Sequence, residues 1–133
     1  MPILGRRSTV FAVAAGFTAV ALGAFGAHGL RPLLEAHGTS TTWATAVQYH
    51  LLHSVVLLAL ALHLQRATAP LAARRLARAA TLFAAGIALF SGSLYLLALG
   101  APRWLGPVTP LGGLSLLAGW IAVGHALWRR DAA

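Results

Sequence analysis

The stretch ATAVQYHLLHSVVLLALALHLQ, residues 44–65, contains no charged residue over its 22 positions. As an α-helix it would be about 33 Å long, which matches the roughly 30 Å hydrocarbon core of a bilayer. The stretch shows no alternation of apolar and polar residues and is rich in Ala and Leu, so a helix is favoured over a membrane strand. We therefore predict a transmembrane helix over residues 44–65.

Three further apolar segments of similar length cover residues 8–28, 76–99 and 110–128. The 133 residues are 59% hydrophobic and only 9% charged, whereas a soluble domain is usually about a quarter charged. Prolines 32, 70, 102 and 107 all lie in the connections, and Thr109-Pro110 has the form of a helix N-cap followed by proline at the first helical position. The sequence predicts an all-α integral membrane four-helix bundle, with residues 1–133 forming a single domain.

The charge is strongly asymmetric about these spans. The chain has a formal net charge of +8, and all ten basic residues are arginine. Because they lie beside the apolar segments rather than on one polar face, they indicate membrane orientation and exclude nucleic acid as a partner. Eight arginines would lie on one side (6, 7, 66, 74, 75, 78, 129 and 130), and only Arg31 and Arg103 on the other. The positive-inside rule places both termini in the cytoplasm. A cleaved signal peptide is the alternative for the first segment.

Several kinds of chemistry are excluded by composition. The chain has no cysteine, which excludes disulfides, iron–sulfur clusters and thiolate metal sites. Neither of its two acidic residues lies in a predicted span, so a proton relay built on Asp or Glu is excluded. A membrane-embedded Ser-His-Asp set lacks its acid for the same reason. We therefore predict a protein that is not an enzyme, with its cofactors, if any, left unknown.

Small residues recur every four positions in three of the spans. Such ridges allow close approach of helix backbones, which drives association in lipid. The predicted packing residues are Ala15, Ala19, Gly23 and Ala27 in the first span, Ala80, Ala84, Ala88 and Gly92 in the third, and Ala118, Ala122 and Ala126 in the fourth. The longest connection, residues 29–43, is expected to form a short interfacial helix over 30–37, with an Arg31–Glu35 pair. Trp43, Trp104 and Trp128 stand at span ends, where indole prefers the interface.

Polar residues of the spans gather in one half of the predicted membrane. When the direction of each span is followed, the polar side chains fall toward the outer ends, and the inner half is nearly bare of them. Polar groups in hydrocarbon usually face the bundle interior and find partners. We therefore predict a polar cluster or ligand site in the outer half, made of His28, Tyr49, His50, His53, Ser91, Ser93, Tyr95 and Thr109.

Three functions fit such a cluster. The first is structural, with hydrogen bonds between helices fixing their register. The second is a site for a quinone or a lipid headgroup, whose carbonyl or phosphate oxygens these side chains could bind. The third is a metal or haem site, either with the i, i+3 pair His50 and His53 and a third histidine, or with His28 and His53 as axial haem ligands.

Four segments together resemble a known family. They are ALGAFGAHGL (21–30), AVQYHLLHSVVLLAL (46–60), LFSGSLYLLAL (89–99) and VTPLGGLSLLAGW (108–120). They resemble the family of small membrane proteins of unknown function that includes bacterial YgdD and eukaryotic transmembrane protein 256. The resemblance covers nearly the whole chain and implies a four-helix protein of the bacterial inner membrane, without implying a function.

The family motifs that match are GAFGAH at 23–28, Tyr49 with His53, FSGSLY at 90–95 and Thr-Pro-x-Gly-Gly at 109–113. His50 stands where the family more often has glutamine, which leaves His28 and His53 as the better metal pair. From spans, ridges and the missing catalytic set, we expect a structural or accessory membrane protein. Its expected partners are the lipid bilayer and either further copies of itself or a larger membrane complex.

Overall fold

The computed structural model describes residues 2–66 and 70–128, and the side chains from residue 6 onward. Its helices are α1 (Pro2–Ala27), α2 (Arg31–Ala36), α3 (Ser40–Arg66), α4 (Pro70–Gly86), a π-helical turn η1 (Ile87–Ser91), α5 (Gly92–Ala98), a 3₁₀ turn η2 (Arg103–Leu105) and α6 (Val108–Trp128). Four helical stretches are long and apolar enough to cross a membrane: Arg6–Ala27, Ser40–Arg66, Pro70–Ala98 and Arg103–Trp128. The predicted all-α membrane fold is confirmed. Each span begins two to seven residues before its predicted start and ends within one residue of its predicted end.

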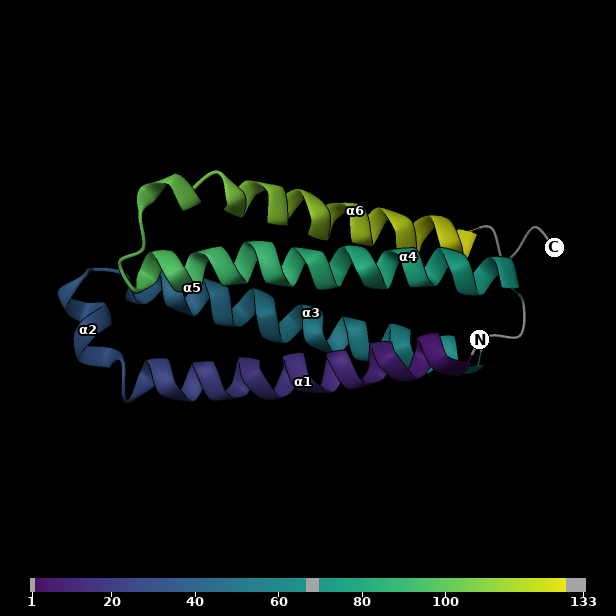
Figure 1. Ribbon diagram of the computed structural model, residues 1–133, viewed down its shortest axis with the longest axis horizontal. Helices are drawn as coiled ribbons and strands as arrows, with labels where there is room; N and C mark the ends of the chain where they lie inside the picture. Colours follow the sequence, from purple (N-terminus) through teal and green to yellow (C-terminus); the bar gives the residue numbers. More distant parts are fainter. Residues whose placement is uncertain (1, 67–69, 129–133) are drawn as a thin grey trace.

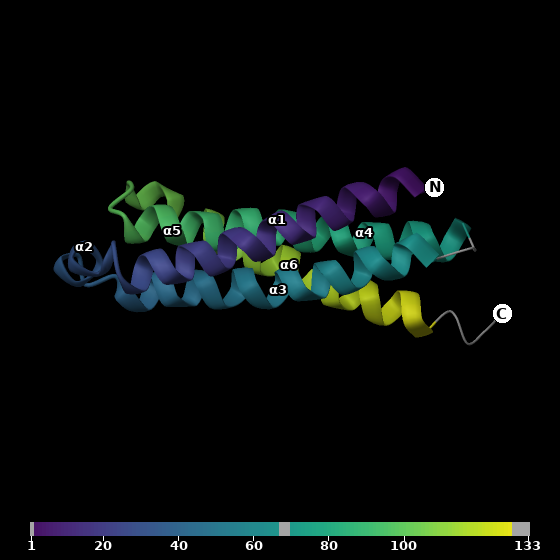
Figure 2. The same cartoon turned by 90° about the horizontal axis from the view of Figure 1, so that it is seen from below.

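The long helices lie side by side along one axis, in the order α1, α3, α4–α5 and α6 (Figure 1). The strongest packing joins α1 to α3 and α4 to α6, and α3 connects the two pairs by lying along α4, η1 and α5. The second view shows that the rods are staggered in depth rather than arranged in a flat row (Figure 2). We call the end that carries α2 and η2 the α2 end, and the opposite end, where α1 begins and α6 ends, the terminal end.

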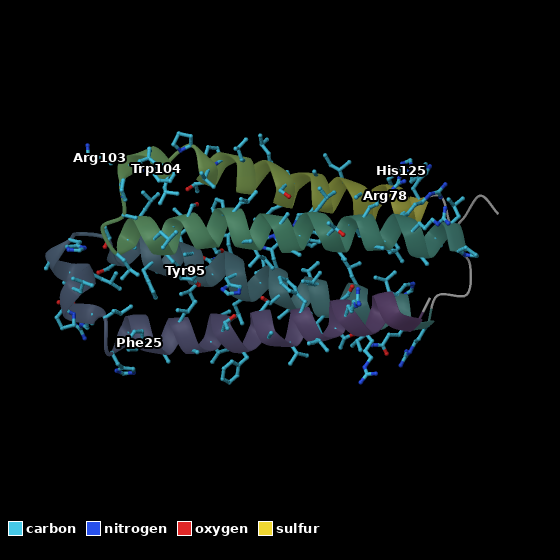
Figure 3. All side chains as sticks on the ribbon, in the orientation of Figure 1. Phe25, Arg78, Tyr95, Arg103, Trp104 and His125 are labelled. Atoms are coloured by element: carbon cyan, nitrogen blue, oxygen red, sulfur yellow. The ribbon has the colours of Figure 1, made fainter. Side chains whose placement is uncertain are left out.

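The described arginines divide between these two ends. Arg78 lies toward the terminal end and Arg103 at the α2 end (Figure 3). Arg6, Arg7 and Arg66 belong to the terminal end by their place at the start of α1 and the finish of α3. Arg129 and Arg130 lie outside the described residues. The helix directions therefore gather positive charge at one end of the bundle, as the sequence predicts.

The main apolar core lies between α3, α4 and α6, and Ala12 of α1 also joins it. Phe83 is its largest fully buried side chain. A smaller core at the α2 end contains Leu34, Trp43 and Ala98. Trp43 was predicted to anchor at the interface, yet it is buried and donates its indole N–H to the carbonyl oxygen of Leu22, 3.0 Å away. The indole can pack inside the bundle because the residue that faces it on α1 is Gly26, which has no side chain.

The predicted ridges of small residues are only partly used for packing. Ala15, Ala19 and Ala80 are buried; Gly23, Ala84 and Gly92 are half-buried; Ala27 and Ala88 are exposed. Four residues advance a helix by about 400°, so a strict four-residue repeat turns about 40° away from its partner at every step. In α1 the buried face continues through Gly26 instead of Ala27, and a Cβ atom at Gly26 would collide with the Trp43 indole.

On α6 the close approach is made by glycines that the four-residue pattern did not mark. Gly112 lies against the main chain of Leu89 and Phe90, so no side chain fits between α6 and the π-helical turn. Gly119 faces the ring of Phe83, whose nearest atom is 2.9 Å from the position that a Cβ would occupy. Predicted Ala118 and Ala122 are half-buried, and Ala126 is buried.

The connection between α1 and α3 contains the short helix that the sequence predicts, over Arg31–Ala36. The guanidinium Nε of Arg31 lies 2.8 Å from Oε1 of Glu35, and both side chains are exposed. This hydrogen bond and the charge of Glu35 raise the pKa of Arg31 above its usual value. Gly38 then adopts a positive φ of 65°, which favours glycine, and the hydroxyl of Thr39 donates to the carbonyl oxygen of Ala98 at 2.8 Å. The α2 end is thereby fastened to α5.

Candidate functional site

His53 has both of its ring nitrogens occupied. Its Nδ1 lies 2.8 Å from the carbonyl oxygen of Tyr49, and its Nε2 lies 3.4 Å from the indole nitrogen of Trp120. A carbonyl can only accept a hydrogen bond and an indole N–H can only donate one. These partners therefore assign the proton of His53 to Nδ1 and leave the ring neutral. The second bond joins α3 to α6.

Aromatic rings surround His53. Its ring centroid lies 5.8 Å from that of Tyr49, 5.6 Å from that of Phe83 and 6.3 Å from that of Trp120. Tyr49 also packs on Phe90 of the π-helical turn, with centroids 4.6 Å apart. Beside these rings a groove of about 440 Å³ runs between α3 and α6. Because the rings pack on one another and the imidazole is saturated, this groove presents mainly apolar surface.

His50 and Tyr95 form a second polar pair, one helical turn closer to the α2 end. Nδ1 of His50 lies 3.3 Å from the Tyr95 hydroxyl, which joins α3 to α5. The hydrogen bond can run in either direction, depending on the tautomer. The Tyr95 ring also packs on Trp43, with centroids 4.7 Å apart. His50 is buried, and Ser54, one turn further on, donates its hydroxyl to the His50 carbonyl oxygen at 2.6 Å.

Ser91 differs from the other buried polar residues of this region because its hydroxyl makes no hydrogen bond. Its side chain is 1% exposed, and its hydroxyl oxygen is the one buried side-chain polar atom among the described residues without a hydrogen-bond partner. Ser91 ends the π-helical turn, in which the Gly92 N–H bonds to the carbonyl oxygen of Ile87, five residues back. Single π-helical turns inside α-helices occur frequently at functional sites. An orphaned buried hydroxyl of this kind calls for an explanation.

Ser93 and Thr109 join α5 to α6. Their hydroxyl oxygens lie 2.7 Å apart, and Ser93 also lies 3.0 Å from the carbonyl oxygen of Phe90. With Thr109 as N-cap, α6 would begin at Pro110, but it begins two residues earlier, at Val108, and the Thr109 hydroxyl bonds to Ser93 of α5. The Thr109 hydroxyl therefore bonds to α5 and does not cap the first turn of α6.

The structure does not bring His28 into the predicted cluster. His28 is exposed in the turn after α1. Gly23 faces Val47 and Gly26 faces Trp43, so His28 is level with about residue 42 of α3. His53 lies eleven residues farther along α3, which is about 16 Å along the helix axis. In this structure His28 therefore lies apart from His53, because the register of α1 on α3 sets its position and the sequence of one span does not contain that register.

The side chains of this region do not suit the metal site or the haem site suggested by the sequence. Metal–nitrogen bonds are about 2 Å long, so His28 and His53 are too far apart to bind one ion or one haem iron. Both nitrogens of His53 are engaged, and coordination would break the bond to Trp120 or the bond to Tyr49. Within the part of the chain that the structure describes, no three His, Asp or Glu side chains are grouped so as to hold a metal ion.

Two residues that matter for this region were not predicted from the sequence. Trp120 donates to His53, and Ser115 donates to the carbonyl oxygen of Leu82 on α4 at 2.8 Å. Both lie in the middle of an apolar span. The signal was available for Trp120, since an indole N–H buried in hydrocarbon needs an acceptor.

The comparisons with known proteins agree with the geometry of a small membrane bundle. Residues 22–113 match the model of a family described as a protein of unknown function, DUF423. The chain belongs to this family. The match begins near the end of α1 and ends just after the start of α6, so it includes every residue of the predicted cluster.

Relatives of the family are similar over most of their length. The chain is 42% identical to a UPF0382 membrane protein of Haemophilus influenzae, over 86% of this chain and 87% of the relative. It is 42% identical to the UPF0382 inner membrane protein YgdD of Escherichia coli, over 86% and 84%. It is 37% identical to a UPF0382 membrane protein of Schizosaccharomyces pombe, over 84% and 95%. No solved structure matches the chain. This DUF423 member is therefore a small integral membrane protein of an uncharacterised family.

Proposed function

We propose that this DUF423 protein is a non-enzymatic accessory protein of the membrane, whose polar side chains fix the register of its helices and which acts within a larger assembly. The observation that carries the proposal is the use made of those side chains. Five of the eight predicted cluster residues, namely His50, His53, Ser93, Tyr95 and Thr109, make side-chain hydrogen bonds inside the bundle, so most of the cluster serves to join helices.

These bonds connect every long helix to a neighbour. Among the described residues six pairs join different helices: Trp43 with Leu22, Gln65 with Thr9, His50 with Tyr95, His53 with Trp120, Ser93 with Thr109, and Ser115 with Leu82. Hydrogen bonds between membrane helices contribute on average about 0.6 kcal/mol each. Six of them amount to about 4 kcal/mol at most, which is sufficient to select one register among several similar packings. A rigid bundle of this kind suits a protein that positions a partner.

Sizing directly from the membrane tests the assembly. The protein would be extracted with a styrene–maleic acid copolymer and its particles weighed by native mass spectrometry, with a known monomeric four-helix protein expressed at the same level as control. We expect particles that hold more than one protein chain, either further copies of the 13.8 kDa chain or a defined partner. Particles with a single copy and no other protein would contradict the proposal.

We further propose that the terminal end faces the cytoplasm of a bacterial cell, with the chain in its inner membrane. The support is the concentration of arginines at that end, since cytoplasmic loops carry excess positive charge. The chain has no cysteine, so single cysteines can be introduced cleanly. In intact cells a membrane-impermeant maleimide should label Ala36→Cys on α2 and leave Leu71→Cys at the start of α4 unlabelled until the cells are opened. The reverse pattern would overturn this orientation.

A further inference from the structure

A second groove, of about 310 Å³, lies between α1 and the rod formed by α4, η1 and α5. α1 packs mainly on α3 and not on this rod, which leaves the groove open between them. Figure 3 shows Tyr95 in the space between α5 and α1. The polar side chains that line the groove are those of Ser91, His50, Tyr95 and Thr18, and the Thr18 hydroxyl already bonds to the carbonyl oxygens of Ala14 and Ala15. The other lining residues are apolar or glycine, with Phe11, Ala14 and Leu22 on α1.

Three residues that line the groove carry hydrogen-bond donors that the protein itself does not fully use. The Ser91 hydroxyl has no partner, although the side chain is almost completely buried. A neutral His50 and the Tyr95 hydroxyl carry one donor hydrogen each, and the single bond between them uses only one of the two. Whichever tautomer is present, one donor of the pair remains. A ligand that satisfies both sites must supply acceptor oxygen.

The position of these donors along the helices restricts the kind of ligand. Ser91 lies seven residues before Ala98, where α5 ends, which is about 10 Å from the end of the helix. With the interface placed at the end of α5, that depth is inside the hydrocarbon layer and below the interfacial region that holds phospholipid ester groups. No charged side chain lines this part of the groove. The ligand must therefore be uncharged, soluble in hydrocarbon and equipped with a carbonyl oxygen within its apolar body.

We propose that this groove binds a lipid-soluble quinone, with a ring carbonyl accepting hydrogen bonds from Ser91 and from the His50–Tyr95 pair and the apolar tail lying along α1. This ligand site goes beyond the accessory role proposed above and does not depend on it. A phospholipid could offer the same carbonyl chemistry only by drawing an ester group below the interface.

Thermal unfolding of the purified full-length protein in detergent micelles tests the site, because a ligand that binds the folded state raises Tm in a saturable manner. Three probes would be compared: decylubiquinone, decylbenzene as an apolar analogue without carbonyls, and phosphatidylglycerol as a source of ester carbonyls. We expect a saturable rise with decylubiquinone alone. A rise of equal size with decylbenzene, a rise only with phosphatidylglycerol, or no rise with any probe would each overturn the proposal.

Two glycine substitutions distinguish the groove from the rest of the surface. Gly92 lines the groove and Gly124 lies on α6 away from it; a Cβ atom at either position would meet nothing within 4 Å. Gly92→Leu should fold but lose the quinone-induced rise in Tm, whereas Gly124→Leu should keep it. Equal responses in the two variants would show that the quinone binds elsewhere and would overturn the site.

Ser91→Ala tests the hydrogen bond itself. Because the hydroxyl has no partner within the protein, its removal should leave the ligand-free protein at least as stable as the wild type. The same change should weaken the apparent affinity for decylubiquinone about fivefold, the effect of losing one ordinary hydrogen bond. An unchanged affinity in Ser91→Ala would exclude Ser91 as the recognition group.

Discussion

Trp120 on α6 and His53 on α3 are joined by a hydrogen bond of 3.4 Å between the indole nitrogen and Nε2 of the imidazole. The two residues are 67 positions apart in the chain. Their rings meet edge to face, and the ring of Phe83 packs against both. This contact links the two helix pairs of the bundle, α1–α3 and α4–α6, and it occupies the lone pair that would make His53 a metal ligand.

Replacing Trp120 with Phe removes the hydrogen bond and keeps most of the ring contact with Phe83. We expect Trp120→Phe to lower the free energy of unfolding by about 0.5–1.5 kcal/mol, the usual contribution of one hydrogen bond. The measurement is chemical or thermal unfolding in a fixed detergent. Trp104→Phe is the matched control, since Trp104 is 72% exposed and should change stability little. Equal losses in the two variants would show that the bond to His53 contributes nothing.

Gly112 is expected to be intolerant of any side chain. A Cβ atom there would overlap the main chain of Phe90, so α6 would have to move away from the π-helical turn. We expect Gly112→Ala to destabilise the bundle by about 1–3 kcal/mol, as over-packing usually does.

Gly124 on the same helix is the comparison, because a Cβ atom there meets nothing within 4 Å. Gly124→Ala should stabilise α6 by up to about 1 kcal/mol through helix propensity alone. The two alanine variants should therefore shift Tm in opposite directions. Shifts of the same sign would mean that α6 does not approach the π-helical turn as closely as described.

The pair Gly26 and Ala27 tests which face of α1 packs on α3. Gly26 is buried against the Trp43 indole, while Ala27 is exposed. Gly26→Leu should therefore disrupt the packing of α1 on α3 and lower Tm sharply, and Ala27→Leu should be tolerated. Thermal unfolding of both variants, with tryptophan fluorescence as the probe of Trp43, gives the answer. A larger loss in Ala27→Leu would favour the four-residue ridge instead.

Two serines, two residues apart, should respond oppositely to alanine. Ser93 bonds to Thr109 and to the carbonyl oxygen of Phe90, so Ser93→Ala should cost about 1 kcal/mol of stability. Ser91 has no partner, and Ser91→Ala should raise stability by up to about 1 kcal/mol when no ligand is bound. The measurement is the unfolding midpoint of Ser93→Ala and of Ser91→Ala, each compared with the wild type under the same conditions. A loss of stability in Ser91→Ala would mean that its hydroxyl has a partner within the protein.

The sequence alone determined the membrane character of this protein, its four spans and the gathering of its arginines at one end. These are properties of single segments: the length of an apolar run decides whether it spans the bilayer, and an even number of spans returns both ends of the chain to one side. The likeness to an uncharacterised membrane family was also readable in segments such as GAFGAH and FSGSLY. The loop helix at Arg31–Ala36 followed from local pattern as well.

Only the tertiary structure decided which side chains meet. His28 and His53 both looked like residues of one cluster, but the register of α1 on α3 separates them by about 16 Å along the helix axis. Gly26, and not Ala27, packs on α3. Thr109 bonds to Ser93, and Trp120 bonds to His53. The physical reason is that the rotation and sliding of one helix against another are set by side chains from both helices together, and a hydrophobic pattern within one span contains no information about its partner.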